Sequence, residues 1–305
     1  MTPHERRQGA WLGLMCGDAL GAGVEFMTAD QIRAKHGRVT EMLGGGVFNW
    51  APGETTDDTA LAVATAAAYD GDDFVLERAS DAMVAWLKTG PKDVGNLTRR
   101  ALSMVASGTP AREAGARCLE SGGANAGNGS LMRCLSTGLV RAPDDARLVE
   151  ESVLLSSVTH ADSRCTAACM AYNVMLASLV NGGGLERGFQ TAASLARTLN
   201  EEVAALVEDV AAAGTPRFQT KPIGFVLLCL ERALLAVRDA PNFEDALVDV
   251  VNEGGDADTN AAVAGALLGA RFGTGAIPER WVRALPAQAV SGRASTFRSS
   301  RVHLQ

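Results

Sequence analysis

Residues 258–272, DTNAAVAGALLGARF, place acidic and hydroxyl side chains directly before a run of small apolar ones. Asp258 and Thr259 favour a helix start, because their side chains can satisfy backbone N–H groups that are free there. The apolar residues that follow have helical spacing. Gly265, Gly269 and Gly273 recur at every fourth position and predict a face on which another helix backbone can approach closely. The stretch predicts a tightly packed helix in a soluble bundle.

Helical periodicity dominates the rest of the chain as well. Helices are predicted over Asp58–Tyr69, Phe74–Lys88, Leu97–Ala106, Asp145–Ser157, Arg164–Leu179, Glu201–Ala213 and Asp258–Phe272. Pro222 to Val237 is apolar around nearly its whole circumference, which is typical of a helix at the centre of a bundle. Alternating strand patterns are nearly missing, and Gly46 to Trp50 is too short to count as one. The sequence therefore predicts an all-α fold.

The composition excludes several classes of protein. With 47% hydrophobic residues the chain is too apolar to be disordered, and its 33 glycines have no collagen period. The net charge of −7 comes without a long basic stripe, so no nucleic-acid partner is expected. No apolar run is long enough to span a membrane. Residues 5–24 are predicted to be the first helix and not a signal peptide, because Asp18 interrupts their apolar part.

The six cysteines are scattered without a C-x-x-C pair, which indicates reduced thiols and a cytoplasmic protein. No linker divides the chain, so one compact domain is predicted over residues 1–290, followed by a Ser- and Arg-containing tail over 291–305. A monomer is expected.

Two helix starts resemble each other. Residues 58–64, DTALAVA, match residues 258–264, DTNAAVA, and each segment follows an acidic cluster, ETTDD at 54–58 and GDAD at 255–258. One Asp and one Thr would suffice to cap a helix, but each helix start carries two carboxylates and at least one hydroxyl within four positions. Crowded carboxylates repel unless a cation or proton compensates, and such oxygen donors suit Mg²⁺ or Mn²⁺. Two interpretations stay open here, a pair of helix caps or a two-metal centre. The candidate ligands are Thr56, Asp57, Asp58, Asp256, Asp258 and Thr259.

Of four further features, three allow two interpretations and one has a simple structural explanation. Glu25 is a lone carboxylate in an apolar stretch, either a solvated loop residue or part of a site. The glycine loop at 127–129, GNG, precedes the apolar segment 131–140 and forms either a simple turn or a phosphate cradle at a helix start. His160 either caps a helix or contacts a ligand, and Asp93 is explained by N-capping of the next helix.

Taken together, these motifs resemble the ADP-ribosylglycohydrolase family, and within it most of all the bacterial dinitrogenase reductase-activating glycohydrolases. The matching segments run in family order from residue 9 to about residue 285. They are GDALG at 17–21 with VEFM at 24–27, GGG at 44–46, TDDT at 56–59, WLK at 86–88, DVGN at 93–96, AGNG at 126–129 with MRC at 132–134, TH at 159–160 and GGDADT at 254–259. No family motif is matched between residues 185 and 245 or after Ser291.

The resemblance implies an all-α domain with two divalent ions, Mg²⁺ or Mn²⁺, in a central cleft. It implies a hydrolase that cleaves the N-glycosidic bond between ADP-ribose and a protein side chain, most typically arginine, and so reverses mono-ADP-ribosylation. The partners would be the modified protein and the product ADP-ribose. By position, the metal ligands would be Thr56, Asp57, Asp58, Asp256, Asp258 and Thr259. Glu25 would lie beside the metals and the ribose, and Asp93 near the substrate arginine. The ADP-ribose pocket would be lined by Asn128, Gly129, Ser130 and Met132, with His160 on ribose.

The chemistry of such a bond is consistent with these residue types. Its cleavage passes through an oxocarbenium-like state that nearby carboxylates stabilise. Glu25, Asp57 and Asp93 are the candidates for proton transfer, including protonation of the departing guanidine. Other functions stay open: a hydrolase of O-linked (serine-type) or free ADP-ribose derivatives, a non-catalytic ADP-ribose-binding member, or a metal-dependent pyrophosphohydrolase.

Overall fold

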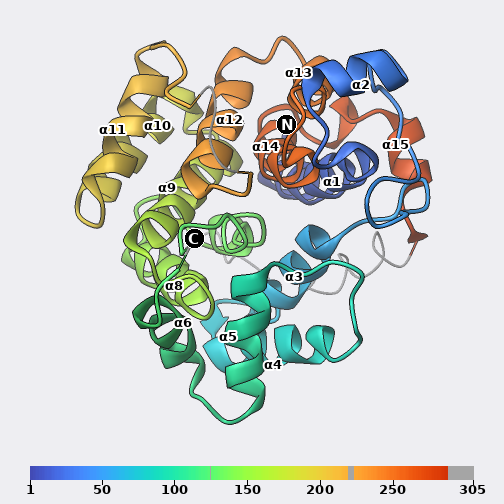
Figure 1. Cartoon of the computed structure of the whole chain (residues 1–305). Coiled ribbons are helices and arrows are strands. Elements are labelled where there is room, and N and C mark those ends of the chain that lie inside the picture. Colours follow the sequence, from blue (N-terminus) through green and yellow to red (C-terminus); the bar gives the residue numbers. More distant parts are fainter. Residues whose placement is uncertain (124, 219–222, 288–305) are drawn as a thin grey trace.

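The computed structural model describes residues 1–123, 125–218 and 223–287. Fifteen α-helices dominate this part of the chain, so the all-α prediction is confirmed (Figure 1). They are α1 (Pro3–Gly21), α2 (Ala29–His36), α3 (Asp57–Ala66), α4 (Leu76–Leu87), α5 (Asn96–Ala106), α6 (Ala111–Glu120), α7 (Ser136–Val140), α8 (Ala146–Ser157), α9 (Ser163–Val180), α10 (Gly184–Arg197), α11 (Glu201–Ala211), α12 (Val226–Asp239), α13 (Phe243–Asn252), α14 (Ala257–Phe272) and α15 (Glu279–Ala284). Two 3₁₀ helices, η1 (Ala22–Val24) and η2 (Thr274–Ala276), and two short strands, β1 (Tyr69–Asp70) and β2 (Asp73–Phe74), complete the elements.

Helices α1 and α14 lie side by side at the centre of one half of the molecule (Figure 1). Four glycines of α1 face α14 at intervals of four residues: Gly9, Gly13, Gly17 and Gly21. A Cβ atom added to Gly13 would lie 2.0 Å from the carbonyl oxygen of Gly265, so the two backbones are in direct contact. At the other end of this glycine contact, a Cβ on Gly21 would lie 2.4 Å from the backbone nitrogen of Asp258. The contact therefore places the acidic start of α14 against the end of α1.

Helices α9 and α12 complete the centre of the bundle. Every residue of α9 from Cys165 to Val180 is buried, and α9 packs against α8, α10 and α14. Helix α12 packs against α9, α11, α13 and α14, which agrees with its apolar circumference. It begins at Val226; the predicted start, Pro222, lies outside the described residues. Gly224 has a φ of +80°, a conformation that an α-helix cannot continue, so the helix starts after it.

The prediction of helix through Tyr69 and again from Phe74 is wrong at both boundaries. Helix α3 ends at Ala66 and α4 starts at Leu76, because Tyr69 and Phe74 pair in a two-stranded antiparallel hairpin. Gly71, with a φ of +62°, allows the tight turn at the Asp-Gly step between the strands.

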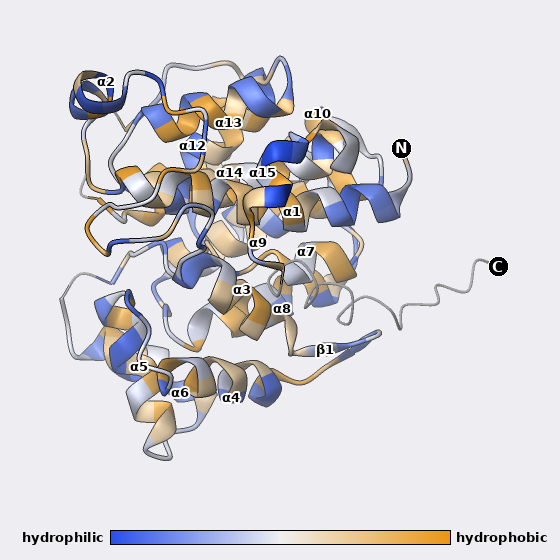
Figure 2. Cartoon of the chain, turned by 90° about the vertical axis from the view of Figure 1, so that its right-hand side faces the viewer, coloured by the Kyte–Doolittle hydropathy of each residue, from blue (hydrophilic) through white to orange (hydrophobic). Residues whose placement is uncertain are grey.

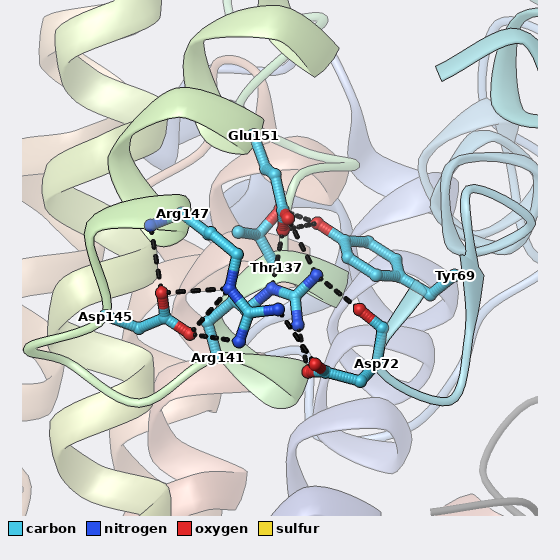
Figure 3. A network of polar contacts seen from close by, with 7 residues as sticks. All are labelled: Tyr69, Asp72, Thr137, Arg141, Asp145, Arg147 and Glu151. Carbon is cyan, nitrogen blue, oxygen red and sulfur yellow. Dashed lines mark hydrogen bonds and ion pairs between the residues drawn. The ribbon is translucent and has the colours of Figure 1, made fainter. Parts of the chain in front are cut away.

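A buried ion-pair network holds this hairpin against α7 and α8 (Figure 3). Arg141, whose side chain is 1% exposed, donates from Nε and Nη2 to the two carboxylate oxygens of Glu151 at 2.8 and 2.7 Å. Arg141 also pairs with Asp72 at the hairpin turn. The Tyr69 hydroxyl donates to Glu151 at 3.1 Å, and burial together with this carboxylate raises the pKa of Tyr69. The network fixes the loop that follows α3.

Helices α4, α5 and α6 form a small layer on one side of the bundle, next to α3 and α8 (Figure 2). A separate cluster of buried apolar side chains lies between α5 and α6 and is formed by Ala101, Ala114 and Cys118. Sequence periodicity found α4 and α5 but did not predict α2, α6, α7, α10, α13 or α15. The segment that precedes α5 carries Asp93, so this layer supplies one wall of the site described below.

Among the described residues, the helices are too short or too polar to cross a lipid bilayer. All six cysteines are buried thiols. The main apolar core includes residues from Ala10 to Leu285. Residue 290 and the tail 291–305 lie outside the described residues, so the proposed domain boundary stays a prediction.

Candidate functional site

The start of α3 is held by a carboxylate from α1. Asp18 is fully buried; its Oδ1 accepts a hydrogen bond from the Thr56 N–H at 2.9 Å. Its Oδ2 accepts from the Thr59 N–H at 3.1 Å and from the Thr59 hydroxyl at 2.5 Å. Burial raises the pKa of Asp18 to about 6, and these hydrogen bonds oppose that rise. Asp18 thus satisfies N–H groups at a helix start, which sequence reasoning did not assign to it.

The two acidic helix starts face each other. The Thr259 hydroxyl of α14 donates to Asp58 Oδ2 of α3 at 3.4 Å, and the Thr56 hydroxyl donates to the same oxygen at 3.0 Å. Thr56 also caps α3, because its Oγ1 accepts from the Asp58 N–H at 3.3 Å. Asp256 sits at the N-cap of α14 without a side-chain capping bond, and its Oδ2 instead accepts from Asn128 Nδ2 at 2.6 Å. Helix capping therefore accounts for Thr56 but not for the carboxylate of Asp256.

Glu25 is brought to the same place by the turn after η1. Phe26 has a φ of +65°, and its N–H donates to the Gly255 carbonyl at 2.7 Å, which ties the turn to the loop before α14. Glu25 is 4% exposed, so the interpretation as a solvated loop residue is wrong. Glu25, Asp256 and Asp258 each offer a carboxylate oxygen, and these three atoms all lie within 4.8 Å of one another.

The crowded carboxylates are not electrostatically satisfied by the chain alone. Burial, and then the charges of neighbouring carboxylates, raises the pKa of Glu25 to about 9 and that of Asp57 to about 8. The same causes raise the pKa of Asp58 and Asp258, while burial raises that of Asp256. Three buried carboxylate oxygens have no hydrogen-bond partner within the part of the chain that the structure describes: Glu25 Oε2, Asp58 Oδ1 and Asp258 Oδ1. Carboxylate oxygens without a partner, in a cluster where oxygens of Glu25, Asp256 and Asp258 lie within 4.8 Å of one another, fit a divalent cation that prefers oxygen ligands.

A pocket of about 410 Å³ opens over this acidic cluster. Most of the residues expected at the site line it: Glu25, Asp57, Asp93, Asn128, Gly129, Met132, His160, Asp256, Asp258 and Thr259. Thr56 and Asp58 are not among the lining residues, although Asp58 is bonded to Thr259. Sequence reasoning missed Phe26, Asn96 and Thr98, which also line the pocket. Nothing in their residue types distinguishes these three from ordinary loop and helix-surface residues.

The glycine loop 127–129 forms another wall. The Asn128 N–H donates to the Gly224 carbonyl at 2.9 Å, which ties the loop to the segment before α12. The loop does not lie at a helix start, because turns follow it and α7 begins only at Ser136. Ser130, expected to line the pocket, is not among its lining residues: it is fully buried, and its hydroxyl lies 2.9 Å from that of Ser156 and accepts from the Cys169 thiol. Its side chain is turned into the core behind the loop.

The side chains of Asp93 and His160 do not cap a helix. The N-cap of α5 is Gly95, so Asp93 has no capping task; it is half-buried, faces the pocket, and burial raises its pKa. Helix α8 ends at Ser157 with Val158 as its C-cap, and the backbone N–H of His160 donates to the Ser156 carbonyl at 2.8 Å, so the backbone of His160, and not its side chain, bonds to the end of this helix. His160 is 3% exposed, and burial lowers its pKa to about 3. Both side chains are therefore available to a ligand.

Comparisons with known proteins agree with this arrangement. The model of the ADP-ribosylglycohydrolase family matches residues 1–300. The chain is 32% identical to the ADP-ribosyl-[dinitrogen reductase] glycohydrolase of Rhodospirillum rubrum over 284 residues, which is 92% of this chain and 90% of the relative. It is 34% identical to the ADP-ribosylarginine hydrolase Tri1 of Pseudomonas putida over 293 residues, 92% of this chain and 75% of that protein. A solved ADP-ribosylglycohydrolase-related protein complex superposes with a TM-score of 0.75 at 32% identity, covering 98% of this chain and 99% of the solved one. The chain therefore belongs to the ADP-ribosylglycohydrolase family.

Proposed function

We propose that this chain is a metal-dependent hydrolase that removes ADP-ribose from arginine side chains of a modified protein. Its family and its relatives, which are named as glycohydrolases of ADP-ribosylated dinitrogen reductase and of ADP-ribosylarginine, support ADP-ribosyl glycohydrolase activity. The observation that carries the proposal is the meeting of two acidic helix starts and Glu25 beneath a pocket walled by a glycine loop and His160. The partners are the mono-ADP-ribosylated protein and the product ADP-ribose, and the proposed compartment is the cytoplasm.

The acidic cluster is proposed to hold two divalent ions, Mg²⁺ or Mn²⁺. The proposed ligands are Thr56, Asp57, Asp58, Asp256, Asp258 and Thr259, and the position of Glu25 within the cluster adds it to them. Bound ions would neutralise the cluster, hold ribose hydroxyls and acidify an attacking water. The three unpartnered carboxylate oxygens support the fit, because a buried anionic oxygen without a partner is costly.

The chain's own residues would bind, orient and protonate the substrate. The backbone of the glycine loop, Asn128 and His160 form walls that can hold an ADP-ribose moiety. Asp93 is proposed as the acid that protonates the departing guanidine, because it faces the pocket from outside the metal cluster and its pKa is raised by burial alone. Glu25 and Asp57 remain the proposed groups for activating the attacking water. An acid on one wall and anionic groups beneath suit an oxocarbenium-like transition state.

We expect the full-length protein with Mg²⁺ to convert arginine-ADP-ribosylated protein into free ADP-ribose and unmodified arginine. Chelation with EDTA should lower this rate by at least about 100-fold, because the reaction would lose its charge stabilisation. The products are separated by chromatography and identified by mass spectrometry, with a serine-ADP-ribosylated protein as the parallel substrate.

Other outcomes of this assay would contradict the proposal, and most of them would indicate a different function. Faster turnover of the serine-linked substrate would overturn the arginine assignment. Formation of AMP and ribose phosphate would identify a pyrophosphohydrolase, and tight ADP-ribose binding without turnover would identify a binding protein. Activity that survives EDTA unchanged would exclude the metal-dependent mechanism.

The substitution Asp93→Asn should lower turnover of the arginine-linked substrate by about 10²- to 10⁴-fold, which is the usual contribution of a general acid. Mg²⁺ binding, measured by calorimetry, should stay unchanged because Asp93 is outside the proposed ligand set. Asp70→Asn, at an exposed position of β1, is the matched control and should keep full activity. Full turnover by Asp93→Asn would remove Asp93 from this role, and full turnover by Glu25→Gln would do the same for Glu25.

A further inference from the structure

Arg133 is a fully buried cation, and its hydrogen-bond acceptors in residues 1–123, 125–218 and 223–287 are all neutral. Its Nε donates to the Gly129 carbonyl at 3.2 Å, and its Nη1 to the Thr65 hydroxyl at 3.3 Å. Its Nη2 donates to the Leu155 carbonyl at 3.2 Å and to Thr159 Oγ1 at 2.9 Å. Burial lowers the pKa of Arg133 to about 10, so it stays charged at neutral pH. Burying a guanidinium without a carboxylate is costly. Two of its acceptors, Gly129 in the pocket wall and Thr159 next to the pocket residue His160, indicate a role for Arg133 at the pocket.

The Thr159 hydroxyl links Arg133 to His160, because its oxygen accepts from Arg133 and also lies within hydrogen-bond distance of the His160 ring. Thr159 is fully buried, and its Oγ1 lies 2.7 Å from His160 Nδ1. Arg133 can only donate, so it occupies a lone pair of Oγ1. If Nδ1 also donated, the hydroxyl proton would be left without an acceptor in a dry interior, at a cost of about 1–3 kcal/mol. The hydroxyl therefore donates to Nδ1, and Nδ1 carries no proton.

The single proton of the ring must then be on Nε2. The ring is neutral, because burial and the charge of Arg133 lower the pKa of His160 to about 3. Nε2 lies beside the glycine loop: a Cβ on Gly127 would be 3.3 Å from it and one on Gly129 3.2 Å. His160 lines the pocket, so the Nε2–H is a donor presented to whatever oxygen occupies that side.

We propose that Arg133 and Thr159 are positioning residues that lock His160 as a neutral Nε2–H donor. This Arg133–Thr159–His160 relay selects ligands with an acceptor oxygen at that wall, such as a phosphate or ribose oxygen of ADP-ribose. Because Arg133 also holds the Gly129 carbonyl, one cation fixes the donor and the glycine loop relative to each other. The use of the donor rests on the proposed function, whereas the lock itself does not.

The lock is tested on the full-length, ¹⁵N-histidine-labelled protein by long-range NMR of the imidazole rings. The His160 signals are assigned with a His160→Gln variant. In the unmodified protein we expect Nδ1 at its unprotonated and Nε2 at its protonated chemical shift. Thr159→Val removes the hydroxyl but little volume, and should move both nitrogens towards averaged tautomers, whereas Thr159→Ser should restore the original pattern. A protonated Nδ1 in the unmodified protein, or an unchanged spectrum for Thr159→Val, would overturn the lock.

The use of the donor is tested by calorimetric binding of free ADP-ribose in Mg²⁺. Thr159→Val should raise Kd by about tenfold, the effect of losing one oriented hydrogen bond, and Thr159→Ser should recover it. The matched control is Thr137→Val, which removes another fully buried hydroxyl, bonded to Tyr69 outside the pocket, and should change Kd by less than about twofold. An equal loss in both valine variants, or none in Thr159→Val, would overturn the donor role. If the unmodified protein does not bind ADP-ribose at all, the proposed function fails, and the NMR spectrum still decides the lock.

Discussion

The substitution Asp258→Asn should lower the rate of ADP-ribosylarginine hydrolysis by at least about 10³-fold, and yet it should make the metal-free protein more stable. Asp258 is 1% exposed, and it shares the cluster with Glu25 and Asp256. Its Oδ1 has no hydrogen-bond partner among the described residues. A carboxylate in that position stabilises a bound cation and destabilises the fold without one. The substitution should therefore separate catalysis from stability, with opposite signs.

The sign of the stability change follows from the direction of the pKa shifts. Asp258, Asp57 and Glu25 all have folded-state pKa values above those of an unfolded chain, with Asp57 at about 8 and Glu25 at about 9. Their contribution to metal-free stability is present below about pH 4 and is lost as the pH rises through these folded values. In EDTA, urea unfolding should therefore give a lower free energy of unfolding at pH 8 than at pH 5. Asp258→Asn removes one ionisable group from the cluster, so the free energy of unfolding of this variant should fall less between pH 5 and pH 8 than that of the unmodified protein.

Added Mg²⁺ should make the unmodified protein more stable than Asp258→Asn, the opposite of the order expected in EDTA. Ligand that binds only the folded state stabilises it by RT ln(1 + [L]/Kd), so the unmodified protein should gain stability with Mg²⁺ and Asp258→Asn should gain much less. Asp81→Asn, at an exposed position of α4, is the matched control and should behave as the unmodified protein in both conditions. An equal Mg²⁺ gain in Asp258→Asn would show that Asp258 is not a ligand. A loss of stability in EDTA would show that its carboxylate stabilises the fold by itself.

The sequence predicted the acidic part of the site because its signal is local. Residues 54–58 and 255–258 each bring several carboxylates together at a helix start. Their mutual repulsion can be recognised from those few consecutive residues alone. Asp18 lacks such a signal. The N–H groups of Thr56 and Thr59 that it satisfies lie about forty positions further along the chain, so its role appears only when α1 and α3 meet. Arg133 is similar, since its partners come from three separate segments.

The fold was predictable to the extent that one helix carries its own pattern. The stripe of Gly265 and Gly269 indicated a close helix contact, but not that its partner is the matching stripe of α1. Ser130 illustrates another limit: it directly follows the glycine loop, yet the turn there points its hydroxyl into the core and away from the pocket lining. Which way a side chain points in an irregular turn depends on backbone dihedrals that no periodicity reports.

The substitution Gly13→Ala should lower the free energy of unfolding by about 3 kcal/mol, although alanine is a better helix former than glycine. At an exposed helical position the same change would stabilise the protein by about 1 kcal/mol. At Gly13 the new Cβ would lie 2.0 Å from the Gly265 carbonyl oxygen, and backbone cannot move aside as a side chain can. The control Gly275→Ala, where a Cβ meets nothing within 4 Å, should change stability by less than about 0.5 kcal/mol. Urea unfolding in EDTA measures both.

The double variant shows whether the cost comes from this one contact. A Cβ on Gly265 would lie 2.2 Å from the Gly13 carbonyl oxygen, so either alanine alone must push α1 and α14 apart. Once they are apart, the second alanine should add little, and the two costs should fall short of additivity by at least about 1 kcal/mol. Full additivity would mean that the helices do not separate and that each cost is local. Separation would also move Asp258, whose backbone touches Gly21 at the end of the same glycine contact, away from Glu25. Gly13→Ala should therefore weaken Mg²⁺ binding at temperatures where it is still fully folded, because the glycine contact sets the spacing of the carboxylates.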